Sequence, residues 1–144
     1  MTKFTLKTYR PSAETEKPHF YILNKGMNSG KPLKQPCPNC FILIAPTEEA
    51  KEQLYWLCFG LWRAKSFHYY LKGSVIPFIT KNDLKQGILN GFEQANNDIP
   101  IFKKSVKALQ LLEEQEKVYQ LNLKLIDDAR RAVFYRYISK KRYS

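Results

Sequence analysis

The segment that could bind phosphate is the glycine-rich run at residues 26–31, GMNSGK. It departs from the P-loop of nucleotide-hydrolysing enzymes, which has four residues between its glycines where this run has three. The residue after the lysine is Pro32, where the P-loop needs a hydroxyl that binds Mg²⁺. A nucleotide-hydrolysis site is therefore not predicted.

A weaker chemistry remains for this segment, which is anion binding. Glycines allow backbone N–H groups to converge on an anion, and the surrounding polar side chains could assist them. These side chains are Asn24, Lys25, Asn28, Ser29, Lys31 and Lys34. The alternative is a long hairpin loop whose glycines serve turns and whose lysines are solvated. Both interpretations stay open at this point.

The pair Cys37 and Cys40 has the CxxC form of a zinc knuckle. A structural zinc site needs four ligands, and the remaining candidates are Cys58, His19 and His68. Cys58 and His68 fall on one predicted helix about 15 Å apart along its axis, so they cannot share an ion. A thioredoxin-type site needs the first cysteine at a helix N-terminus, and here a strand is predicted to follow. We therefore expect no metal and no cofactor, and interpret the pair as a proline turn.

Catalytic residues are not predicted, because the chain has only two histidines and no adjacent carboxylate pair on a recognisable strand or loop. Glu48, Glu49 and Glu52 suit the start of a helix, and Asp127 and Asp128 suit intrahelical pairing with the arginines that follow. The aromatic residues around Trp56, Trp62 and His68-Tyr69-Tyr70 could form a stacking platform. Their helical spacing favours a core role instead.

The C-terminus carries the strongest binding signal. Six basic residues follow Asp128 with no acid among them, and four aromatic residues are interleaved with them. Basic side chains neutralise phosphates, while aromatic rings stack on exposed bases. The basic residues are Arg130, Arg131, Arg136, Lys140, Lys141 and Arg142. The alternative is an amphipathic helix end whose rings pack on the core and whose bases face water.

The distribution of charge agrees with two cationic surfaces. Residues 1–46 carry a net +5, residues 47–100 are neutral, and residues 101–144 carry +6, which gives the total of +11. A neutral middle between two basic ends is typical of a small core that presents cationic surfaces to a polyanion. The odd number of cysteines and the absence of an N-terminal apolar signal predict a reducing, cytoplasmic location. The most apolar run is too short to cross a bilayer, so no membrane span is expected.

Three strands are predicted in the N-terminal half. Alternation predicts a half-buried strand over 3–9, and aromatic and branched residues predict another over 19–24. Residues 41–45 (FILIA) are apolar on both faces, which is typical of a central strand. The proline- and glycine-rich stretch 25–39 is predicted to be the long loop of an antiparallel hairpin.

Two helices are predicted in the middle of the chain. Thr47 is a plausible N-cap for a core helix that runs to about Leu71, with Gly73 as its stop. Residues 75–79 (VIPFI) are interpreted as an edge strand or an extended strip. Thr80 then caps a second helix that reaches about residue 96.

The remainder is predicted to be helical from about 102 to 140, as one long helix or two with a bend. Apolar residues recur at steps of three and four along one stripe. Glu116 and Arg130 interrupt this stripe, which argues against a strict coiled coil.

Three sequence blocks, FYILNKGMNSGKPL, PCPNCFILIA and KGSVIPFI, together resemble an uncharacterised family of small bacterial proteins. The resemblance covers about residues 19–92 and leaves out the final basic helix. It implies a bacterial cytoplasmic protein, carried by mobile elements, and it brings no assigned activity or catalytic residues. It would make the glycine-rich loop a shared feature of the family.

The sequence as a whole predicts a single α+β domain over residues 1–144, with a basic helical extension from about 130. A small, mainly antiparallel sheet of three to four strands would pack against the core helix. The leading hypothesis is a non-enzymatic protein that binds the phosphates of DNA or RNA through the glycine-rich loop and the basic helix. The alternative is a protein–protein interaction or assembly module, including a homodimer, built on the C-terminal helix. An enzyme that holds a phosphorylated small molecule in the glycine-rich loop is a third hypothesis.

Overall fold

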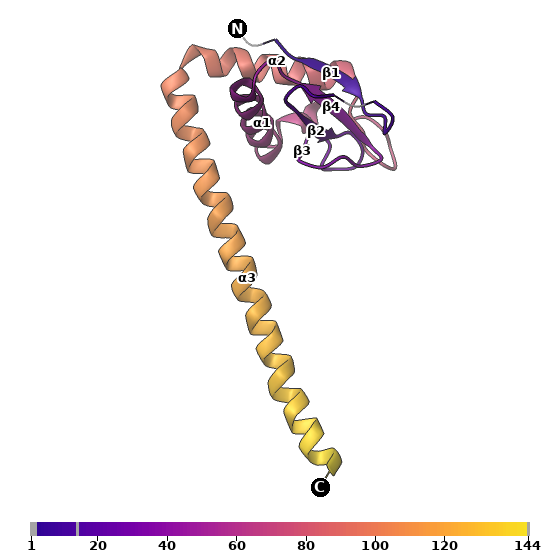
Figure 1. Ribbon diagram of the computed structural model, residues 1–144, viewed down its shortest axis with the longest axis vertical. Helices are drawn as coiled ribbons and strands as arrows, with labels where there is room; N and C mark the ends of the chain where they lie inside the picture. The colour runs from indigo at the N-terminus through magenta and orange to yellow at the C-terminus, as the bar shows by residue number, and fades with distance from the viewer. Residues whose placement is uncertain (1–2, 14, 144) are drawn as a thin grey trace. The chain divides into compact units, whose positions relative to one another are not determined.

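The computed structural model describes residues 3–13 and 15–143, and side chains as far as Ser139. Its internal contacts divide the chain into two units, residues 1–106 and residues 107–144. Unit 1 contains the sheet, helices α1 and α2, and the start of α3, whereas unit 2 is the rest of α3 (Figure 1). The predicted α+β class is thereby confirmed.

The sheet has four antiparallel strands in the order β1-β4-β2-β3. Strands β1 (Thr5–Thr8), β2 (His19–Leu23) and β4 (Cys40–Ile44) match the three predicted strands. The fourth, β3 (Pro32–Leu33), lies inside the stretch predicted to be only loop. It was missed because two residues that include a proline give no strand pattern.

Strand β4 is central, as its apolar character predicted. It pairs with β1 on one side and β2 on the other, and its first four residues are buried. Phe20, Ile22 and Leu43 point from the sheet into the core, where the buried side chains of the helices meet them. A strand buried on both faces has no solvated side and therefore carries no polar alternation.

Helix α1 (Glu48–Arg63) begins as predicted, because the Thr47 hydroxyl accepts a hydrogen bond from the Ala50 amide at 3.1 Å. It ends eight residues before the predicted Leu71. Lys65 adopts a left-handed conformation with φ 60°, and a short 3-10 helix, η1 (Ser66–Tyr70), follows. The turn at Lys65 redirects the chain so that Phe67 is buried in the core.

Helix α2 (Lys81–Asn97) starts where it was predicted, since Thr80 accepts a hydrogen bond from the Asp83 amide at 3.2 Å. Of the two interpretations of residues 75–79, the edge strand is not observed. Phe78 makes only isolated bridges, with Lys25 and Lys72, and Val75 is 89% exposed. Pro77 lies within this short segment, and a proline cannot donate a ladder hydrogen bond.

Helix α3 (Ile99–Tyr143) is a single helix of 45 residues, so the predicted long helix is observed and the alternative of two helices with a bend is not. It begins after Asp98, whose carboxylate accepts a hydrogen bond from the Ile101 amide at 3.1 Å. Within the described residues, no helix has the length and apolar character that a membrane crossing would require.

Candidate nucleic-acid interface

The glycine-rich loop between β2 and β3 uses its glycines for turns. Gly26 and Gly30 have φ of +95° and +101°, a region that residues with a side chain rarely adopt. The Gly26 amide donates to Pro77 O at 2.6 Å, and the Gly30 amide donates to Leu23 O at 2.8 Å. The Ser29 and Lys31 amides also donate within the loop, to the carbonyls of Gly26 and Asn28. These four amides are therefore unavailable to an anion, which removes much of the backbone site considered from the sequence.

Ser29 is a structural residue. It is 1% exposed, and its hydroxyl donates to the Gly26 carbonyl at 2.6 Å. Asn28 and Lys25 are exposed on the same loop. The loop is thus an ordered hairpin connection that presents side chains to solvent, with the Ser29 hydroxyl turned inward.

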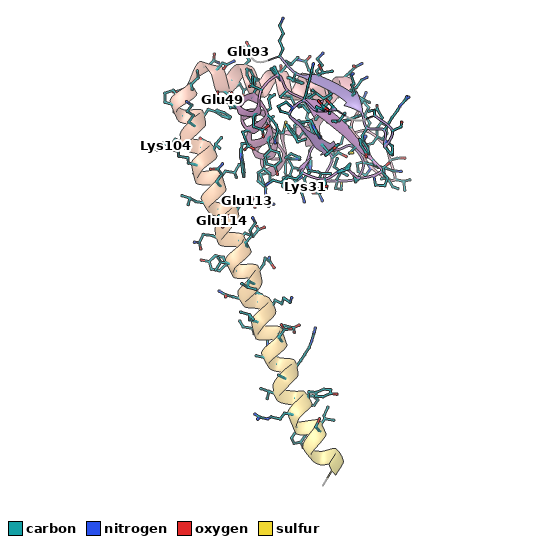
Figure 2. All side chains as sticks on the ribbon, in the orientation of Figure 1. Lys31, Glu49, Glu93, Lys104, Glu113 and Glu114 are labelled. Carbon is teal, nitrogen blue, oxygen red and sulfur yellow. The ribbon has the colours of Figure 1, made fainter. Side chains whose placement is uncertain are left out.

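The lysines that flank β3 lie over aromatic rings of α1. The Nζ atom of Lys31 is 5.1 Å from the centroid of the Trp62 ring, and that of Lys34 is 5.8 Å from the Tyr55 ring. These separations are within the range of cation–π attraction. In Figure 2, Lys31 is found near the end of α1 that is opposite Glu49. The sequence predicted these lysines but not the surface that they share.

Helix α1 supplies a continuous aromatic row beneath these lysines. Ring centroids are 5.4 Å apart for Tyr55 and Trp56, 5.2 Å for Trp56 and Phe59, and 5.4 Å for Phe59 and Trp62. All four rings are half-buried. The Cζ atom of Arg63 lies 4.4 Å from the Trp62 centroid. We call this set the cation–aromatic face: Lys31, Lys34, Tyr55, Trp56, Phe59, Trp62 and Arg63.

A shallow hollow adjoins the cation–aromatic face. It has a volume of about 250 Å³ and is lined by His19 and Phe20 of β2, by Lys34, and by four residues of α1: Lys51, Glu52, Tyr55 and Trp56. Lys51 already pairs with Glu48, with 2.7 Å between Nζ and Oε1. The hollow places Lys34 beside the Tyr55 and Trp56 rings, a combination that suits a base with a phosphate, but the Glu52 carboxylate in the same lining repels an anion.

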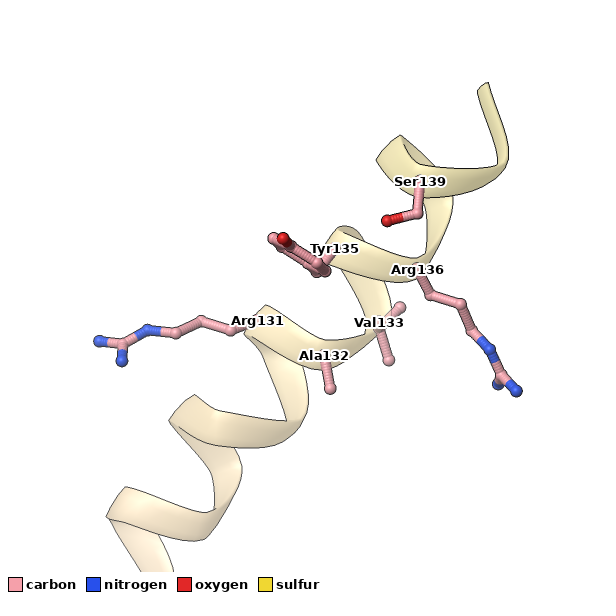
Figure 3. Close-up of a pocket in the computed structure, with 6 residues that line it drawn as sticks. All are labelled: Arg131, Ala132, Val133, Tyr135, Arg136 and Ser139. Carbon is pink, nitrogen blue, oxygen red and sulfur yellow. The ribbon is translucent and has the colours of Figure 1, made fainter. Parts of the chain in front are cut away.

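The predicted basic surface of α3 lies in unit 2. Arg130, Arg131 and Arg136 are exposed, and Arg131 pairs with Asp127 at 2.8 Å between Nη2 and Oδ2. Figure 3 shows Arg131 and Arg136 projecting to opposite sides of the helix, with Ala132 and Val133 between them. The six residues drawn in Figure 3 line a hollow on the surface of α3. Because all six come from this one helix, the hollow is open to solvent. Lys140, Lys141 and Arg142 lie outside the residues whose side chains the structure describes.

A basic hollow lies on the face of the sheet that points away from the core, and it was not predicted from the sequence. Its volume is about 270 Å³, and Lys7, Arg10 and Lys17 line it together with residues of β1 and β4. Nearby, the rings of Tyr9 and Tyr21 meet edge to face at 5.3 Å. The alternation of Thr5 and Lys7 along β1, continued by Tyr9 just after it, was the available signal, but the basic residues of the following loop approach it only after folding.

The three cysteines are free thiols. The Cys40 thiol donates to the Cys37 carbonyl at 3.1 Å, and Cys40 begins β4, as expected of a turn that enters a strand. Burial raises the pKa of the Cys40 and Cys58 thiols, which keeps both neutral at physiological pH. Among the described residues, no group of three or more histidine, cysteine or acidic side chains could hold a metal ion.

These features define a small basic α+β protein with an ordered glycine-rich loop and a cation–aromatic face on α1. The chain belongs to a family of unknown function, DUF6943, whose pattern matches residues 6–136. This confirms the resemblance to an uncharacterised family and extends it from β1 well into α3, as far as Arg136. No curated protein and no solved structure matches the chain.

Proposed function

We propose that the protein binds nucleic acid without catalysing a reaction on it, and that the cation–aromatic face contacts the strand. The observation that carries this proposal is the placement of Lys31, Lys34 and Arg63 within 4.4–5.8 Å of ring centroids on α1. Basic groups neutralise phosphates, and adjacent rings stack on bases. One surface thus offers both contacts that a nucleotide strand requires.

The same chemistry favours single strands over duplexes. Bases in a duplex are already stacked, whereas those of a single strand can lie on aromatic side chains. The four half-buried rings of α1 follow one another at centroid spacings of 5.2–5.4 Å, with interplanar angles of 58–82°, so they could accept individual unstacked bases but not a continuous base stack. Recognition of this kind depends on phosphates and ring faces, so it carries little sequence preference.

Exposed basic residues elsewhere would add phosphate contacts. Lys25 lies on the glycine-rich loop, and Arg131 and Arg136 lie on α3. Asn28 is exposed beside Lys25 and could donate to a phosphate. Ser29 is left out because its hydroxyl is buried and already bonded.

We also propose that the protein works in a reducing, cytoplasmic setting. Three free cysteines favour a reducing compartment, which supports a cytoplasmic location. A bacterial origin on a mobile element rests on the family resemblance alone. A protein in that setting would meet both DNA and RNA, and the cation–aromatic face does not contain a feature that selects one sugar.

The test is fluorescence anisotropy of labelled single-stranded DNA, single-stranded RNA and duplex DNA of equal length, titrated with the full chain across a salt series. We expect single strands to bind with micromolar or tighter Kd at low salt. Log K should fall linearly with log salt, by about 0.7 for each phosphate neutralised on a single strand. Absence of binding at low salt would contradict the proposal. Tighter binding to the duplex would contradict the stacking role of the rings.

A further inference from the structure

The basic hollow of about 270 Å³ on the outer face of the sheet combines positive charge with an apolar floor, and we call it the outer-face hollow. Its basic residues are Lys7 of β1 and, in the connection between β1 and β2, Arg10 and Lys17. All three are exposed. Ile42 and Ile44 of β4 line the same hollow and are less exposed, so the apolar side chains lie deeper than the charges.

The floor of the outer-face hollow is covered although it lies outside the core. In the register of β1 and β4, Leu6 pairs with Leu43 and Lys7 pairs with Ile42. Leu6 and Leu43 belong to the core cluster, so Lys7 and Ile42 lie on the opposite face of the sheet. Ile42 is nevertheless only 8% exposed. A covered apolar floor outside the core is the environment that suits the organic part of a small ligand.

The connection that carries Arg10 and Lys17 has a fixed backbone. The Tyr9 amide donates to a carbonyl of β4 at 3.2 Å, and the Ala13 amide closes a turn by donating to the Arg10 carbonyl at 3.0 Å. The Lys17 amide donates to the Thr15 hydroxyl at 3.2 Å, which leaves the O–H of Thr15 free to donate into the hollow that it lines. The backbone of the site is therefore in place before a ligand arrives, which reduces the entropy lost on binding.

The positive charge of the outer-face hollow is not compensated within the described part of the chain. Its described lining contains three basic side chains and no acidic one. Lys7, Arg10 and Lys17 form no ion pair with another described residue. The hollow beside α1 differs, because Glu52 lies in its lining. Three uncompensated cations around a small volume favour a compact anion with more than one negative charge.

We propose that the outer-face hollow binds a small molecule that carries a phosphate monoester. Such a group has a charge of about −1.5 to −2 at neutral pH and three terminal oxygens that accept hydrogen bonds. The Arg10 guanidinium, the lysine ammonium groups and the Thr15 hydroxyl are the donors. The organic part of the ligand lies on Ile42 and Ile44. A volume of about 270 Å³ is near the lower limit for ligand pockets, which restricts the ligand to a small one.

This inference goes beyond the proposed nucleic-acid function and does not depend on it. Helix α1 contributes Leu54 and Leu57 to the core cluster that Leu43 also joins, so the sheet separates the outer-face hollow from the cation–aromatic face. Phosphates within a strand are diesters with one charge each, which match three cations less well than a monoester does. A strand offers a monoester only at a phosphorylated end, and the experiment tests that source separately.

The experiment is isothermal titration calorimetry of the full chain at about pH 8, where a phosphate monoester is doubly charged. Phenyl phosphate is the probe, and we expect a Kd of about 1 mM or tighter. Phenyl sulfate has the same ring with one charge, and inorganic phosphate has no ring. Each should bind at least about fivefold more weakly than phenyl phosphate. Absence of phenyl phosphate binding, or equal affinity for either comparison compound, would overturn the proposal.

Two double variants locate the probe. Arg10→Ala/Lys17→Ala removes two charges from the outer-face hollow and should weaken phenyl phosphate binding by at least about tenfold. Lys31→Ala/Lys34→Ala removes two charges from the cation–aromatic face and should change the affinity by less than about twofold. Arg10 and Lys17 are exposed and lie outside the helices and strands, so their variant should unfold at the same temperature as the wild type. Equal losses in the two variants, or the reverse order, would refute the site.

A competition distinguishes a free small ligand from the end of a strand. Two single-stranded oligonucleotides of one sequence, with a 5′-phosphate and a 5′-hydroxyl, are added to the complex of wild type with phenyl phosphate. We expect neither to displace the probe. Displacement by the phosphorylated strand alone would assign the outer-face hollow to strand ends, and displacement by both would make it part of the nucleic-acid interface. Either result would overturn the proposal of a small free ligand.

Discussion

The ring of Phe67 occupies the space in which a side chain on Gly30 would have to lie. A Cβ atom built on Gly30 would fall 2.7 Å from the Cγ atom of Phe67, well inside van der Waals contact. Phe67 is almost fully buried, so its ring has little room to move away. The glycine-rich loop therefore packs against η1 through a contact between Gly30 and Phe67 that only glycine permits.

Gly30→Ala should destabilise the protein by about 3 kcal/mol, which combines the left-handed backbone cost with the cost of overpacking. The measurement is the free energy of unfolding from urea titration. Gly26→Ala is the matched control, since Gly26 also has positive φ, but a Cβ atom added there would meet no other atom within 4 Å. It should cost only about 1–2 kcal/mol. Equal losses in the two variants would show that the Phe67 contact is unimportant.

Lys65→Gly should stabilise the protein by about 0.5–1 kcal/mol. Lys65 is the only described residue other than glycine with positive φ, and it follows the last turn of α1, where glycine is the usual residue. Glycine would relieve the strain of the left-handed backbone. This gain in stability is partly offset because glycine has greater conformational freedom in the unfolded chain. Thermal unfolding measures the change. Lys65→Ala removes the charge but keeps the Cβ atom, so a gain of equal size there would refute the backbone explanation.

Lys31→Ala/Lys34→Ala should weaken binding to single-stranded DNA and reduce the magnitude of its log–log salt slope by about 1.4, because two phosphate contacts are lost. The anisotropy salt series measures both quantities. Lys81→Ala/Lys85→Ala, on the exposed side of α2, removes the same charge from the same unit and is the control. If the control lowers the slope equally, net charge rather than the cation–aromatic face governs binding.

Stability should fall above about pH 9, with a contribution from Cys58. Burial raises the pKa of this thiol in the folded state above its unfolded value of 9.0. The thiol is neutral in both states at lower pH, so its contribution to stability is complete there. Above pH 9 this thiol deprotonates in the unfolded chain before it does so in the folded protein. The free energy of unfolding therefore falls by about 1.4 kcal/mol per pH unit.

Cys58→Ala isolates that contribution. The variant should be less stable at every pH because of the cavity it leaves, but its free energy of unfolding should fall less steeply above pH 9. Urea titrations at several pH values measure the two slopes. Parallel pH profiles for wild type and variant would contradict a shifted pKa for Cys58.

The sequence predicted most of the fold because its strongest signals are local. Thr47 and Thr80 marked both helix starts, and the apolar run of β4 marked the central strand. The end of α1 was missed because Lys65 occupies a position where glycine is the usual signal, so the stop was assigned to Gly73 instead. The two residues of β3 were missed because their pairing with β2 is set by the tertiary fold.

The candidate site was predictable only as a set of residue types. Lys31 and Lys34 were selected from the sequence, but their position over Trp62 and Tyr55 depends on how β3 packs against α1. The inward turn of the Ser29 hydroxyl likewise depends on the loop backbone. Such relationships join residues that are distant in sequence, and no local pattern encodes them.

Both tryptophans of the chain belong to the aromatic row on α1. Tryptophan emission, excited at a wavelength that tyrosine does not absorb, therefore originates at the cation–aromatic face, next to Lys31 and Arg63. The molecule consequently carries its own optical reporter at this face, and a ligand that settles there alters the spectrum without any attached dye.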